Sequence, residues 1–109
     1  EREEFLNIGV ILFSKRKKYL GIKYKIDAKR IVSFSEEVDL DIVESYIEGW
    51  RLVCEGGAKG GKIGMLERSL RFRWLTAPRS TIIQSSRIHP GLCKNPEMVL
   101  EDLLRRYVL

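Results

Sequence analysis

Two apolar segments near the start of the chain have the pattern of neighbouring strands. Residues 5–13 form a nearly continuous apolar run rich in Val and Ile, which is typical of a strand buried on both faces. Residues 19–26 alternate apolar positions with lysines, as in a strand with one solvated face. Because a short polar stretch separates them, we expect an antiparallel hairpin, with Val10 and Leu12 deeply buried.

Helical spacing dominates the middle of the chain. From Leu40, apolar residues recur every three or four positions until the Gly56-Gly57 pair, which predicts a helix of about 15 residues ended by glycine. Trp50 and Cys54 lie on its apolar stripe, so we assign both to the core. Residues 27–34 are interpreted as a helical turn or an irregular link.

Carboxylates gather where this helix begins. Asp39, Asp41 and Glu44 would suit a metal or an acid–base pair, but the same residues cap a helix N-terminus and offset its dipole. We adopt the capping interpretation.

The second half of the chain predicts two more helices and a strand. Leu66, Leu70 and Trp74 stand four apart, which favours a helix over residues 67–76, although alternation with arginines leaves a strand open. Residues 80–85 are expected to form a short strand. Asn95 and Pro96 then begin a last helix with a broad apolar face.

These elements predict one domain, over residues 1–109, of the α+β class. An antiparallel sheet, made of the N-terminal hairpin plus the later strand, would be covered by helices mainly on one face. The length suits a single modest core.

A glycine-rich stretch follows the first long helix. Residues 56–62 read GGAKGGK, which matches most of the phosphate-cradling loop GxxxxGK[ST]. That loop requires a strand before it and a hydroxyl residue after the lysine, whereas a helix precedes this one and Ile63 follows. We interpret the stretch as a flexible connector.

Composition and charge narrow the function classes without choosing one. The net charge of +5 permits nucleic-acid binding but does not require it; we regard the basic residues 15–18 as a solvated hairpin tip. Cys54 and Cys93 form no CxxC motif, which favours free thiols in a reducing compartment. No apolar run is long enough for a membrane span, so we expect a cytoplasmic protein with no membrane partner.

Residues 71–93 combine arginines, aromatics, hydroxyls and the single histidine. Arginine beside aromatic rings can stack and donate in a fixed fork, which suits binding an anion, a base or a partner's carboxylates. Arginines and hydroxyls after a helix end could also form an anion-binding nest. The candidate binding residues are Arg71, Arg73, Trp74, Arg79, Ser80, Thr81, Gln84 and His89.

The same segment also has interpretations that involve no ligand. Its arginines could instead hold the loop against the last helix by ion pairs with Glu67, Glu97 or Glu101. His89 and Cys93 are four residues apart, as two zinc ligands could be, but only one other cysteine could complete such a site, so we do not assign zinc. His89 as a general base would need an orienting group, which the sequence does not reveal. We therefore assign no catalytic residue, metal or cofactor, and lean towards a protein that is not an enzyme.

Three motifs support a resemblance. The stretches EREEFLNIGVILF (residues 1–13), RFRWLTAPRSTIIQ (71–84) and HPGLC (89–93) occur in the order seen in domain of unknown function 3037, a family of small bacterial proteins. The resemblance implies no reaction. Members of the family are often encoded beside HipA-like kinases, which implies a protein partner.

Family members usually carry one more apolar strand ahead of the EREEF segment. The chain starts at Glu1 without an initiator Met, so we expect that strand to be missing. The strand at residues 5–13 would then have an unpaired edge, which favours a homodimer of this shortened form.

The preferred function is a non-enzymatic protein-interaction module, with a HipA-like kinase as a possible partner and residues 71–89 as its contact surface. One alternative is a nucleic-acid-binding domain that uses the hairpin-tip lysines and the arginines. The other is a small enzyme that uses His89.

Overall fold

The structure is a computed structural model and describes residues 6–35, 37–77, 83, 85, 91 and 94–109. Its sheet is an antiparallel hairpin of β1 (Gly9–Ser14) and β2 (Tyr19–Tyr24), paired from Gly9↔Tyr24 to Ser14↔Tyr19. The hairpin predicted from the sequence is therefore confirmed.

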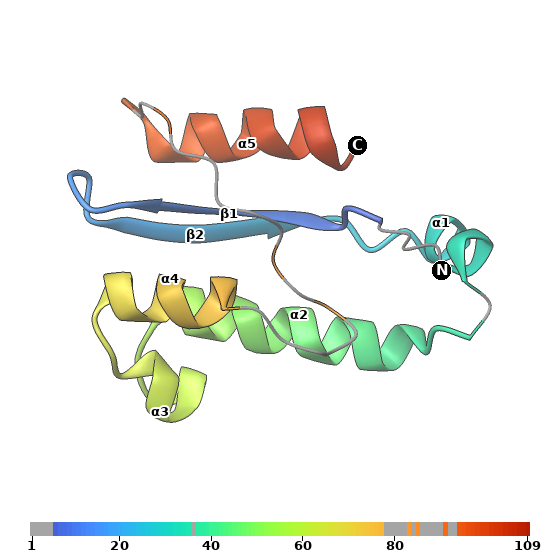
Figure 1. Cartoon of the computed structure of the whole chain (residues 1–109), viewed down its shortest axis with the longest axis horizontal. Coiled ribbons are helices and arrows are strands. Elements are labelled where there is room, and N and C mark those ends of the chain that lie inside the picture. Colours follow the sequence, from blue (N-terminus) through green and yellow to red (C-terminus); the bar gives the residue numbers. More distant parts are fainter. Residues whose placement is uncertain (1–5, 36, 78–82, 84, 86–90, 92–93) are drawn as a thin grey trace.

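Helices cover both faces of this hairpin (Figure 1). Helix α2 (Leu40–Glu55) and helix α4 (Arg68–Thr76) pack on one face, and α5 (Pro96–Tyr107) packs on the other. A short helix, α1 (Ala28–Phe34), lies beyond the end of the strands that is opposite the turn. The α+β class and the helical interpretation of residues 67–76 are confirmed.

Side chains cap the N-termini of the two long helices, as the sequence suggested. The Asp39 side chain accepts hydrogen bonds from the backbone N–H groups of Asp41 and Ile42 at the start of α2. Asn95 accepts one from Met98 N–H at the start of α5, 3.2 Å away. Both satisfy donors that an isolated helix leaves open. Asp39 is thus a cap, and no group of potential metal ligands occurs within the described residues.

The main cluster of buried side chains lies between the hairpin, α2 and α4. It contains Leu20, Trp50, Val53, Cys54 and Leu75. Leu75 is completely buried, and the rings of Phe13 and Phe72 stack with centroids 5.2 Å apart, which joins β1 to α4. The assignment of Trp50 and Cys54 to the core is confirmed.

The expected deep burial of Val10 and Leu12 is wrong, because both are only half-buried. Ile11 and Phe13 pack against the core cluster, and successive side chains of a strand point to opposite faces. Val10 and Leu12 therefore face the side that the single helix α5 covers. One helix over a two-stranded ribbon leaves such side chains partly open to water.

The glycine-rich stretch is also more ordered than a flexible connector. It forms a 3₁₀ turn, η1 (Ala58–Gly60), followed by a helical turn, α3 (Gly61–Gly64). The backbone N–H of Gly57 donates to the carbonyl of Gly64 over 2.8 Å. A Cβ on Gly64 would lie 2.4 Å from the Gly57 oxygen, so a side chain there would break this closure.

The strand predicted over residues 80–85 is not seen at its two described residues, because neither Ile83 nor Ser85 lies in a strand. The other four residues of that segment lie outside the described residues. The dimer through the β1 edge stays a prediction. Across the described ranges, no helix is both long and apolar enough to cross a membrane.

Candidate functional site

Three of the eight candidate binding residues lie in the described part of the chain, all on α4: Arg71, Arg73 and Trp74. The other five, Arg79, Ser80, Thr81, Gln84 and His89, lie outside the described residues. Arg73 is exposed and lies two residues after the buried Arg71, so its side chain leaves the helix in a different direction. The structure therefore does not bring them together into one patch.

Arg71 is used inside the fold. Its side chain is buried, with 8% exposed. The guanidinium donates from Nη1 to the carbonyl oxygens of Val53 and Cys54, each 2.8 Å away, and from Nε to the carbonyl of Leu66 over 2.9 Å. The last carbonyls of a helix have no partner within the helix. Arg71 thus closes the C-terminal end of α2, in place of the binding role and the glutamate ion pairs considered from the sequence.

Gly56 makes room for this arrangement. It has a φ of 84°, a left-handed conformation that favours glycine, and a Cβ there would lie 2.7 Å from Arg71 Nη1. The glycine that ends α2 and the arginine of α4 therefore form one unit. Glu101, another suggested partner of the arginines, forms an ion pair with Lys23 of β2 instead.

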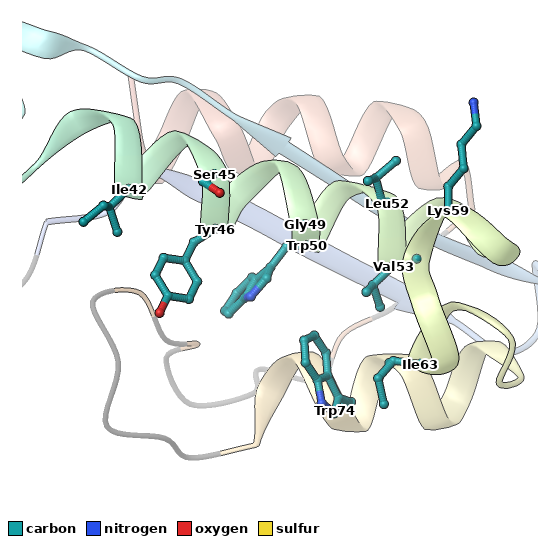
Figure 2. A pocket seen from close by; sticks show the side chains of 11 residues that line it. Ile42, Ser45, Tyr46, Gly49, Trp50, Leu52, Val53, Lys59, Ile63 and Trp74 are labelled. Atoms are coloured by element: carbon teal, nitrogen blue, oxygen red, sulfur yellow. The ribbon is translucent and has the colours of Figure 1, made fainter.

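Trp74 lies in an apolar groove between α2, the glycine-rich turns and α4 (Figure 2). The groove has a volume of about 550 Å³, within the range of small-molecule sites. The aromatic rings of Tyr46, Trp50 and Trp74 point into it. The remaining lining residues are Ile42, Ser45, Gly49, Leu52, Val53, Lys59, Gly60 and Ile63.

The floor of this groove contains a glycine in the middle of a helix. Gly49 sits well inside α2, and within the described chain no heavy atom lies within 4 Å of where its Cβ would be. Glycine in a helix interior is less favourable than alanine by about 1 kcal/mol. No packing contact within the described residues requires position 49 to be glycine. The missing side chain leaves the α2 backbone open to close approach.

Sequence reasoning identified Trp74 but missed the α2 side of the groove. Ile42 and Tyr46 of α2 line the groove and are each 40% exposed. An isolated glycine inside a helical pattern is a signal that could have marked Gly49. The place of Gly49 in a groove becomes visible only once α4 is packed beside α2.

Cys54 is the one described nucleophilic thiol, and its surroundings suppress its chemistry. Burial raises its pKa to about 12, against a small opposite effect of Arg71. The thiolate is the reactive species, so Cys54 is inert at neutral pH.

We expect Cys54 to resist thiol reagents in the folded protein. In a Cys93→Ser variant at about pH 8, a disulfide reagent should label no thiol until denaturant is added, because burial withholds both access and ionisation. Between about pH 9 and pH 12 the unfolded thiol ionises while the folded one does not, so folding stability should fall with rising pH. Rapid stoichiometric labelling of the native variant would contradict this.

The comparison with protein families covers almost the whole chain. The family model described as Protein of unknown function (DUF3037) matches residues 1–108. The chain belongs to the DUF3037 family. The resemblance seen in the motifs of residues 1–13, 71–84 and 89–93 is therefore confirmed.

Searches of curated proteins and of solved structures find no match to this DUF3037 chain. The family description assigns no reaction, ligand or partner.

Proposed function

We propose that this DUF3037 chain is a protein-interaction module that receives an apolar segment of a partner in the groove between α2 and α4. The observation that supports this most is Gly49, an exposed helix-interior glycine on a groove floor with aromatic walls. A small residue at such a point allows a partner's backbone or side chain to reach the helix.

The dimensions and composition of the groove suit a short peptide element. From Ile42 to Val53, α2 advances by about 17 Å, at about 1.5 Å per residue. That length accommodates roughly three turns of a partner helix, which would place apolar side chains at helical spacing against the groove. Tyr and Trp are enriched at protein interfaces because they combine large apolar area with a polar atom.

The proposed contact surface differs from residues 71–89, the surface predicted from the sequence. Trp74 belongs to both. Arg71 is left out of the proposed surface because its side chain is buried and its Nε and Nη1 atoms donate to carbonyls of the chain. The α2 residues Tyr46, Gly49 and Trp50 are added.

A HipA-like kinase is the first partner to test, since the family resemblance implies it. Enzymatic use of His89 stays a prediction outside the described residues. The inert thiol of Cys54 gives no support to a cysteine-based reaction.

Photo-crosslinking from inside the groove tests the proposal. A photoreactive phenylalanine analogue at Tyr46 should crosslink in the native host to a protein that the same analogue at Tyr107 does not reach. Tyr107 is a matched control because it is an exposed tyrosine on α5, across the sheet. Equal crosslinking from both positions, or crosslinking only from Tyr107, would count against the groove.

A further inference from the structure

The turn of the hairpin concentrates positive charge at one point. Lys15, Arg16, Lys17 and Lys18 occupy the whole turn, and all four are exposed. Within the described residues, none of their side chains forms an ion pair or a hydrogen bond. Four like charges in adjacent positions repel one another, so the turn carries charge that the fold itself does not use.

The backbone of this turn disfavours one of these residues. Lys18 has a φ of 52°, and it is the single non-glycine residue with positive φ in the described chain. Glycine or asparagine is the usual occupant of such a position in a hairpin. A lysine at this position adds charge where turn geometry favours an uncharged residue. Such an outlier points from strain to function.

The turn is also accessible from outside. In Figure 1 it forms one end of the molecule along its longest axis, and α1 lies at the opposite end. The turn is the tip of a two-stranded antiparallel ribbon, a shape that the major groove of B-form DNA admits.

We propose that the Lys15–Lys18 turn binds the phosphate backbone of double-stranded nucleic acid without reading its sequence. Lysine and arginine neutralise phosphates, and the net charge of +5 favours approach to a polyanion. No aromatic residue lies among the four turn residues, so base stacking on a single strand is not the mode of binding. The site is separate from the groove and does not rest on its role.

Salt dependence measures this contact. With a mixed-sequence duplex of about 20 base pairs, the slope of log K against log salt should be about −3 to −4 if all four cations meet phosphates. The double variant Lys15→Gln/Lys17→Gln should weaken binding and reduce the steepness of that slope by about 2. Lys18→Gly should also weaken binding, although it relieves the backbone.

Lys29→Gln is the matched control, because Lys29 is an exposed lysine on α1 at the far end of the molecule. It should leave affinity and slope unchanged, and so should Gly49→Gln in the groove. Thermal melting by circular dichroism confirms that each variant is folded. The proposal fails if Lys29→Gln weakens binding as much as a turn variant, or if turn variants bind the duplex normally. It also fails if turn variants lose binding only to phosphatidylserine vesicles, which would indicate a membrane surface.

Discussion

Replacing Arg71 with methionine should lower the free energy of unfolding by roughly 2–4 kcal/mol. The variant keeps most of the buried alkyl volume but removes all three donors to the carbonyls of Val53, Cys54 and Leu66. Those carbonyls lie where the ends of two helical segments meet, and leaving buried acceptors unpaired carries the full desolvation penalty. Urea unfolding monitored by tryptophan fluorescence would measure the loss.

Arg73→Met is the matched control, two residues away on the same helix and exposed. It should change stability by no more than about 0.5 kcal/mol. Arg71→Lys should fall between the two, because an ammonium lacks the planar fork that serves several carbonyls at once. Equal effects of Arg71→Met and Arg73→Met would show that Arg71 does not close α2.

Filling the groove at Gly49 should weaken partner binding strongly while leaving the fold intact. Gly49→Gln places a long side chain over the α2 backbone, where a partner would make its closest approach. We expect a loss of more than about 30-fold in affinity, equivalent to about 2 kcal/mol. Stability should rise by several tenths of a kcal/mol, because glutamine is a better helix former than glycine and nothing in the described chain occupies the space.

Two variants separate blockage from other effects. Gly49→Ala should stabilise the helix by about 1 kcal/mol and obstruct the groove least. Glu44→Gln introduces the same residue on an exposed α2 position that does not line the groove, so it should bind normally. If Gly49→Gln destabilised the protein, the space above Gly49 would be occupied by the chain itself.

Local signals were sufficient for most of the fold. Periodicity predicted the hairpin and the helices, and Asp39 and Asn95 marked helix starts, because strand alternation, helical repeat and capping depend on near neighbours in sequence. The glycine-rich turns were missed because their closure depends on the contact between Gly57 and Gly64. The burial of Val10 and Leu12 was overestimated, because the width of the sheet determines how much of a strand is covered.

The candidate site was less accessible to sequence reasoning. An arginine beside aromatics suggests a surface, yet Arg71 is buried because α4 packs against the C-terminal end of α2. No local pattern reveals that pairing. Trp74 lines the groove and its binding role stays a prediction, while Gly49 gains meaning from the space beside it. Five of the candidate residues, Arg79, Ser80, Thr81, Gln84 and His89, lie outside the described residues and stay predictions.

The groove is tested most directly by comparing the proteins that co-purify from the native host with three tagged forms of the chain. These forms are the unaltered chain, Glu44→Gln and Gly49→Gln, quantified side by side by mass spectrometry. We predict a partner, with a HipA-like kinase as the first to look for, that the first two retain equally and Gly49→Gln loses. Equal recovery of every partner with Gly49→Gln, in a variant shown to be folded, would contradict a docking role for the groove.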